Sequence, residues 1–170
     1  MKDMLEPLLS LFSWISLPTI FQGMYGRPQL KADFLSCDMR SRHVLGCEVW
    51  NEIAGPKWIK RDTALSVTGS VTIEQLQARR VIHSAPIEFE GDSELAGPRR
   101  RVDIPPGDNG VSIALVDVFQ GVGSVHLHYG EPIGPGEYAV FIGLEEGGRS
   151  WRFSKKLLVT TVSPYAQWTE

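Results

Sequence analysis

The sequence predicts an all-β fold, an antiparallel sandwich of about seven to eight strands with an N-terminal apolar helix. Several segments alternate apolar and polar residues, the 17 glycines and 11 prolines are spread between these segments, and no charge lies between Glu6 and Arg27. With 170 residues, 42% of them apolar, the chain is long enough for one ordinary domain and too short for two. We therefore divide it into an apolar segment, residues 1–27, and a sandwich domain, residues 28–170.

Alternation is clearest in residues 65–74, where Leu65, Val67, Val71 and Ile73 share one face of the predicted strand. Shorter segments repeat the pattern, which places the following sets inside the sandwich: Leu30, Ala32 and Phe34; Leu45, Cys47 and Val49; Val111, Ile113 and Leu115; Tyr138, Val140, Ile142 and Leu144. Glycine-rich turns over residues 105–110 and 145–150 separate such segments. Residues 73–83 fit either a helical turn or a strand with an irregular exit.

The two cysteines, Cys37 and Cys47, do not form a CxxC pair, so the sequence indicates neither a disulfide framework nor a structural zinc site. Two buried free thiols are the simplest interpretation. The alternative is one disulfide, which requires neighbouring strands and an oxidising compartment.

Histidines offer the best candidate for chemistry. His126 and His128 are two residues apart in a predicted strand, so both side chains project from one face. Together they could bind one metal ion if His83 or an acidic side chain supplied a third ligand. The simpler interpretation is that they are solvated on the polar face of a half-buried strand. No nucleophile elbow, phosphate loop or paired-carboxylate motif is present, and we predict no enzyme activity and no cofactor.

Residues 132–144 contain a recognisable pattern. There, Ile133, Pro135, Gly136 and Tyr138 precede a predicted strand. The segment resembles the Leu-x-Pro-Gly-x-Tyr start of a late strand in immunoglobulin-like and fibronectin-like sandwiches. The resemblance implies that Tyr138 forms a corner, its hydroxyl bonding to the backbone a few residues upstream. It implies a fold and no catalytic residue.

The whole layout, an apolar segment followed by a single sandwich, is similar to uncharacterised bacterial membrane-tethered sandwich proteins. About 20 uncharged residues are enough to span a bilayer as a helix. The side chains that would contact the membrane are Leu11, Phe12, Trp14, Ile15, Leu17, Ile20 and Phe21. The alternative is a helix that breaks at Pro18 and docks on the sandwich. A secretory signal is disfavoured, because Asp3 offsets Lys2 and no small-residue cleavage site follows.

Orientation follows from the flanking cations. Only Lys2 precedes the apolar run, whereas Arg27, Lys31, Arg40 and Arg42 follow it. The positive-inside rule therefore predicts a sandwich in the cytoplasm. If the segment docks on the fold instead, the protein is a soluble cytoplasmic one.

These features together predict a membrane-associated, non-enzymatic protein-interaction module, whose partner is another protein or a second copy of the chain. A net charge of −3 gives no electrostatic reason to expect nucleic acid. Two alternatives remain open: a metal-dependent enzyme or metal-binding protein that uses the histidines, and a soluble structural subunit of a larger assembly.

Overall fold

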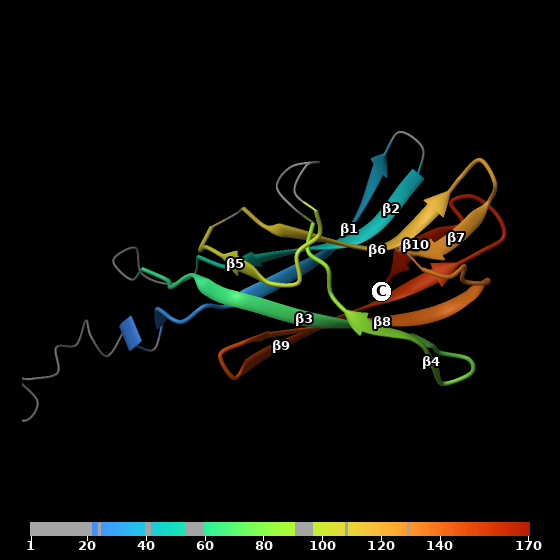
Figure 1. The fold of residues 1–170 in the computed structure, drawn as a ribbon. Helices are drawn as coiled ribbons and strands as arrows, with labels where there is room; N and C mark the ends of the chain where they lie inside the picture. Colours follow the sequence, from blue (N-terminus) through green and yellow to red (C-terminus); the bar gives the residue numbers. More distant parts are fainter. Residues whose placement is uncertain are drawn as a thin grey trace, which may run out of the picture.

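The computed structural model describes residues 22–23, 25–39, 42–53, 60–90, 97–107, 109–128 and 130–170. Within these residues ten strands form two antiparallel sheets that lie face to face, one layer above the other in Figure 1. The all-β class and the two-sheet architecture are therefore confirmed. The strands outnumber the predicted seven to eight because β4 and β10 were not recognised as separate strands.

The first sheet has the order β1-β2-β6-β7. Its strands are β1 (Leu30–Met39), β2 (Arg42–Asn51), β6 (Val111–Phe119) and β7 (Ser124–Leu127). β7 is short and pairs only with the Val116–Phe119 part of β6. The remaining part of β6 therefore has an edge that β7 does not cover.

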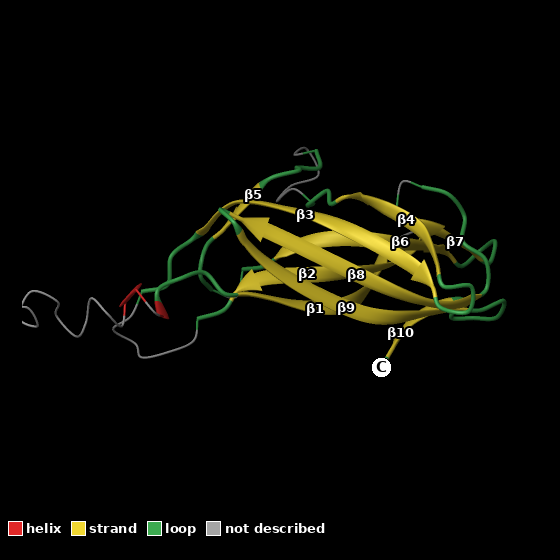
Figure 2. Ribbon diagram, turned by 90° about the horizontal axis from the view of Figure 1, so that it is seen from below, coloured by secondary structure: helices red, strands yellow, loops and turns green. Residues whose placement is uncertain are grey.

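The second sheet has the order β10-β9-β8-β3-β4, and β5 pairs with the first part of β3. Its strands are β3 (Ala64–Gln75), β4 (Arg80–Pro86), β5 (Val102–Ile104), β8 (Gly136–Glu146), β9 (Arg149–Val159) and β10 (Ala166–Thr169). Figure 2 shows the long strands of this sheet crossing the molecule from end to end. Residues 73–83 are strand, turn and strand, so the helical alternative is wrong.

The core lies between the sheets, where the predicted alternation is largely confirmed. The inward residues of β2 and β8 are buried, namely Leu45, Cys47, Val49, Tyr138, Val140, Ile142 and Leu144. Ile87 and Phe89, which follow β4, are buried as well. They lie where the chain crosses between the sheets, because the Ile87 N–H donates to Gly69 O and the Glu90 N–H donates to Ser112 O.

Two positions contradict the simple alternation. Leu65 is exposed, because the pairing of β3 with β5 is irregular between Ala64 and Val67 and Ser66 has a positive φ of 52°. In β6, alternation from Ile113 would turn Asp117 inward with Leu115. The register between β2 and β6 shifts at Leu45/Gly46, and Asp117 points to the outer face.

The predicted N-terminal helix falls outside the described residues, as do the side chains from Leu11 to Phe21 that would contact the membrane. The described residues that follow contain one helical turn, at Gln22, Gly23 and Tyr25, and no longer helix. In the described part of the chain, no helix has the length and apolar character that crossing a membrane requires.

The two long sides of the sandwich differ. On one side the sheets are joined, because Trp168 of β10 donates its indole N–H to Leu35 O of β1 at 2.9 Å and its ring packs edge-on against Phe34. On the other side β4 and β6–β7 face each other. Among the described residues β4 pairs with β3 alone, so its outer edge has no partner strand.

Candidate functional site

A groove of about 250 Å³ lies on the side opposite Trp168, beside the segment after β4 that crosses between the sheets. Its apolar lining comes from β3, from β6 and from residues at and after the end of β4: Val71, Ile73, Ala85, Pro86, Ile87, Ile113, Ala114 and Leu115. Its polar side chains are His83, Glu88, Arg100 and His128. Arg100 and Glu88 form an exposed ion pair, with the nitrogen and oxygen 3.7 Å apart. The groove therefore combines apolar contact with groups that carry or accept positive charge.

The structure separates the three histidines that the sequence singled out. His83 lies in β4 opposite Ile73, and together with His128 it lines the groove. His126 does not line the groove; its ring stacks edge-on against Phe119, with the ring centroids 5.4 Å apart. Among the described residues, no group of three or more histidine, cysteine, aspartate or glutamate side chains is arranged to hold a metal ion.

His128 belongs to a charged cluster that the sequence analysis missed. Its Nδ1 lies 2.9 Å from Oδ2 of Asp117, and Oδ1 of Asp117 lies 3.2 Å from Nη1 of Arg42. Asp117 is only 4% exposed, although it is on the outer face of the first sheet. Its cross-strand neighbours, Val44 of β2 and His126 of β7, cover it from both sides. Charged side chains are rarely buried without a partner, and here Arg42 and His128 supply the partners.

The contact with Asp117 holds the ring of His128 at the mouth of the groove. This indicates a structural role for His128. The signal available in the sequence was an aspartate inside the apolar run of residues 113–119. That signal identifies Asp117 as unusual. It does not identify Arg42, which comes from a strand 75 residues earlier and reaches Asp117 only through the pairing of β2 with β6.

Tyr138 lies near the start of β8 and is buried. Its hydroxyl donates a 2.8 Å hydrogen bond to Gly134 O, four residues upstream. Gly136, between them, has a φ of 155°, a conformation that favours glycine. Burial raises the pKa of Tyr138, so the hydroxyl keeps the proton that this bond requires. This is the corner geometry that the resemblance implies.

The two cysteines are not bonded to each other, and they point to opposite faces of the first sheet. Cys47 is buried in the core, as predicted, whereas Cys37 is exposed, contrary to the interpretation of two buried thiols. Burial, together with the nearby carboxylates of Asp33 and Glu48, raises the pKa of Cys47 to about 12. Cys37 pairs with Val44 and Cys47 with Phe34, so the register keeps them apart.

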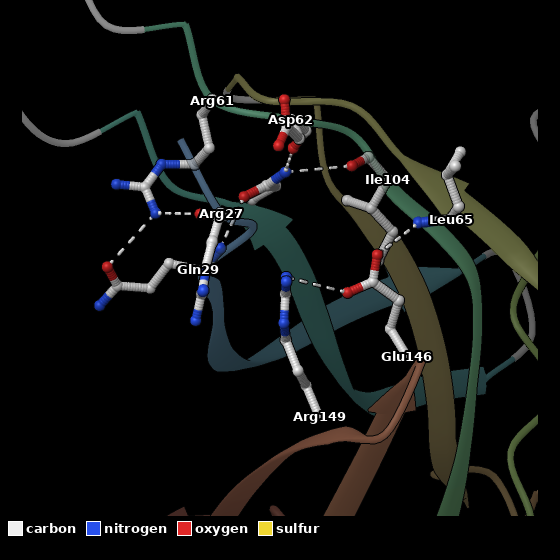
Figure 3. A network of polar contacts seen from close by, with 9 residues as sticks. Arg27, Gln29, Arg61, Asp62, Leu65, Ile104, Glu146 and Arg149 are labelled. Carbon is white, nitrogen blue, oxygen red and sulfur yellow. Dashed lines mark hydrogen bonds and ion pairs between the residues drawn. The ribbon is translucent and has the colours of Figure 1, made fainter. Parts of the chain in front are cut away.

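A second polar network ties the start of the sandwich together (Figure 3). The buried amide of Asn51 donates to Asp62 O and Ile104 O, and its oxygen accepts the N–H of Gln29. Arg61 donates to Arg27 O, and Glu146 accepts the N–H of Leu65 and pairs with Arg149. These bonds join five segments at the end of the molecule where β1 begins.

In comparisons with known proteins, no family model, no curated protein and no solved structure matches the chain.

Proposed function

We propose that this protein is a membrane-associated, non-enzymatic interaction module that binds an extended segment of a partner protein along the outer edge of β4. The observation that carries the proposal is that this edge has no partner strand in the described chain and lies beside the groove.

Strand addition suits this edge. An antiparallel strand has unpaired N–H and C=O groups along its free side, and an extended peptide satisfies them by adding a further strand. The side chains of the added strand alternate, so those on one face would enter the groove. A register shift between Ile73 and Glu74 and the proline at position 86 limit regular pairing to a few residues of β4. The partner segment would therefore be short.

Groove chemistry defines the kind of segment. The apolar lining favours aliphatic side chains, and His83 and Arg100 favour a neighbouring carboxylate. Glu88 is paired with Arg100 and offsets part of that positive charge. A peptide with aliphatic residues and one acidic residue fits best.

The proposal includes an immunoglobulin-like or fibronectin-like topology. The orders β1-β2-β6 and β9-β8-β3 correspond to the A-B-E and G-F-C orders of such sandwiches, and Tyr138 then lies at the start of the strand that carries their tyrosine corner. β7 departs from this pattern, because it follows β6 in the chain and pairs with it where strand D would lie.

Membrane association rests on the uncharged run between Glu6 and Arg27 and on the cations that follow it. The same cations support an orientation with the sandwich on the cytoplasmic side. Cys37 is exposed, so labelling of Cys37 in intact cells by a thiol reagent that cannot cross membranes would contradict this orientation.

Panning a phage library of random peptides against the full chain tests the binding proposal. Selected peptides are expected to carry aliphatic and acidic residues and to shift the backbone amide resonances of β4. Ala85→Arg places a long charged side chain in the groove and is expected to weaken binding at least about tenfold, a loss of roughly 1.4 kcal/mol.

Ala139→Arg is the matched control. Ala139 lies in the same sheet, between the inward residues Tyr138 and Val140, and so faces away from the groove. Binding should survive this change. The proposal is wrong if no peptide is enriched, or if both variants bind the selected peptides as tightly as the unchanged chain.

A further inference from the structure

The apolar run joins the sandwich without a linker. The Gly26 N–H donates to Gln22 O at 2.7 Å, so Gly26 is bonded to the first residue of the helical turn. In the next residues, Gly26 and Pro28 are already buried in the fold. β1 begins at Leu30. Only three residues, Arg27, Pro28 and Gln29, therefore separate the end of the uncharged run at Gly26 from the first strand.

Hydrogen bonds also tie the first described residues to the fold. The Asp62 N–H donates to Gly26 O at 2.6 Å, Arg61 donates to Arg27 O, and the Gln22 side chain donates to Lys60 O. Gly26 has no room for a side chain, because an added Cβ would lie 2.5 Å from Gln22 O. Gln22, Gly26 and Arg27 are thus held against residues 60–62 at one end of the sandwich, and Figure 3 shows the bond from Arg61 to Arg27.

The surface of this end has interfacial chemistry. Tyr25, Ile53 and Leu65 are exposed there, with Ile53 70% exposed. Arg27 and Lys60 are exposed beside Tyr25, within the segments that the hydrogen bonds join. Tyrosine and long cationic side chains are favoured at the level of lipid headgroups, where apolar groups meet phosphate. Of the acids at this end, Glu146 is engaged by Leu65 N–H and by Arg149, Glu52 pairs with Lys31, and Asp62 is exposed.

We propose that this end of the sandwich, formed by Tyr25, Arg27, Ile53, Lys60 and Leu65, rests directly on a phospholipid surface. The inference depends on the membrane association proposed above and adds an orientation to it. With no linker available, a segment inserted in the bilayer brings this end to the headgroups, and the occupant of the surface is the lipid itself. The strands then run away from the membrane, and the opposite end faces solvent; it is formed by the turns after β6 and β9, which carry Val122 and Val162.

Site-directed labelling of the full chain tests this contact. With Cys37 replaced by serine, a nitroxide is attached to Ile53→Cys or, as matched control, to Val122→Cys, which is 80% exposed at the other end. Cys47 stays unlabelled, because it is buried and its pKa of about 12 keeps the thiol protonated. Each protein is reconstituted in vesicles of phosphatidylcholine alone and of phosphatidylcholine with phosphatidylglycerol, and the vesicles are isolated by flotation.

The label at Ile53→Cys is expected to collide with a water-soluble nickel chelate at least about twofold less often than the label at Val122→Cys, because apolar groups at an interface sink below the headgroups. The double charge reversal Arg27→Glu, Lys60→Glu should reduce this contrast in vesicles with phosphatidylglycerol, whereas Arg80→Glu, Lys156→Glu, away from this end, should not.

The outcomes separate the two proposals. If the chain floats with vesicles but both labels are equally accessible, the sandwich does not rest on the lipid and this inference is wrong, while membrane association stands. If the full chain remains in the aqueous fraction, membrane association itself fails and the orientation fails with it.

Discussion

At the scale of single residues, Asp117 is the least expected feature of this protein. A carboxylate on the outer face of a sheet is ordinarily solvated, yet Asp117 is 4% exposed and lies between Arg42 and His128. Its Oδ1 is buried and makes an ion pair with Arg42 instead of a well-aligned hydrogen bond. The cluster fixes β7 against β6 at the mouth of the groove, where β7 is only four residues long.

Replacing this carboxylate tests its contribution. We expect Asp117→Asn to lower the free energy of unfolding by about 2 kcal/mol, the scale of hydrogen bonds to charged groups, because the buried cluster loses its negative member. Urea denaturation followed by tryptophan fluorescence measures the change.

Asp38→Asn is the matched control for that experiment. Asp38 also contacts a histidine, with 2.6 Å between Oδ1 and His43 Nδ1, but its side chain is exposed. An exposed pair contributes roughly 0–1 kcal/mol, so this substitution should be nearly neutral. Equal losses for the two variants would show that burial does not strengthen the Asp117 interactions.

At the scale of elements, β3 determines how closely the second sheet packs. It pairs with β8 over eight residues and with β4 and β5 on its other side, so it is the centre of the sheet. Gly69 lies where three segments converge. An added Cβ would be 2.7 Å from Gly143 O, 2.7 Å from Leu144 Cδ2 and 2.9 Å from Ile87 Cδ1. Gly69 therefore marks a close approach of these segments.

A single methyl group tests that packing. Gly69→Ala is expected to destabilise the protein by about 2 kcal/mol, within the range for overpacked cores, because the carbonyl of Gly143 belongs to a paired strand and cannot move away cheaply. The midpoint of thermal unfolding and urea denaturation both report the change.

Gly143→Ala provides the comparison. Gly143 is in the neighbouring strand, but an added Cβ there would meet only Ser70, at 3.4 Å from its Oγ. Neither glycine has a positive φ, so backbone strain does not separate the two variants. If Gly143→Ala destabilises as strongly as Gly69→Ala, the close contacts at Gly69 are not the cause.

At the scale of the whole molecule, the sandwich has two different sides and two different ends. Trp168 joins the sheets on the β1–β10 side, and the opposite side carries the unpaired edge of β4 and the groove. The polar network around Asn51 closes one end. Protein binding and lipid contact, as proposed, would therefore use separate surfaces.

The closed side can be weakened selectively. Trp168→Phe removes the bond to Leu35 O, worth about 1 kcal/mol, and should speed amide hydrogen exchange in β1 and β10 while leaving β3 and β8 protected. Mass spectrometry of deuterium uptake measures each segment. Trp151→Phe makes the same change in β9, against the core and away from this contact, and should leave exchange in β10 unchanged.

The limits of prediction follow from the range of each interaction. Alternation at positions two apart is local, and it correctly gave the inner faces of β1, β2 and β8. It was wrong at Leu65, and it does not continue from Leu115 to Asp117, because irregular pairing with another strand changes which face a residue occupies. β10 was missed because four residues with one tryptophan carry too little pattern. The sequence identified His83, His126 and His128 as one group of candidates. It did not indicate that His126 lies apart from the groove that the other two line.

By itself, the sequence determined the all-β class, the main strands and most of the core, because these depend on residue types that repeat along a few consecutive positions. Only the tertiary structure decided which side of the sandwich carries the free edge of β4, that Asp117 meets Arg42, and that Gly26 ends against residues 60–62. Each of these joins groups far apart in the chain, and the pairing order of the strands, which no short stretch encodes, is what brings them together.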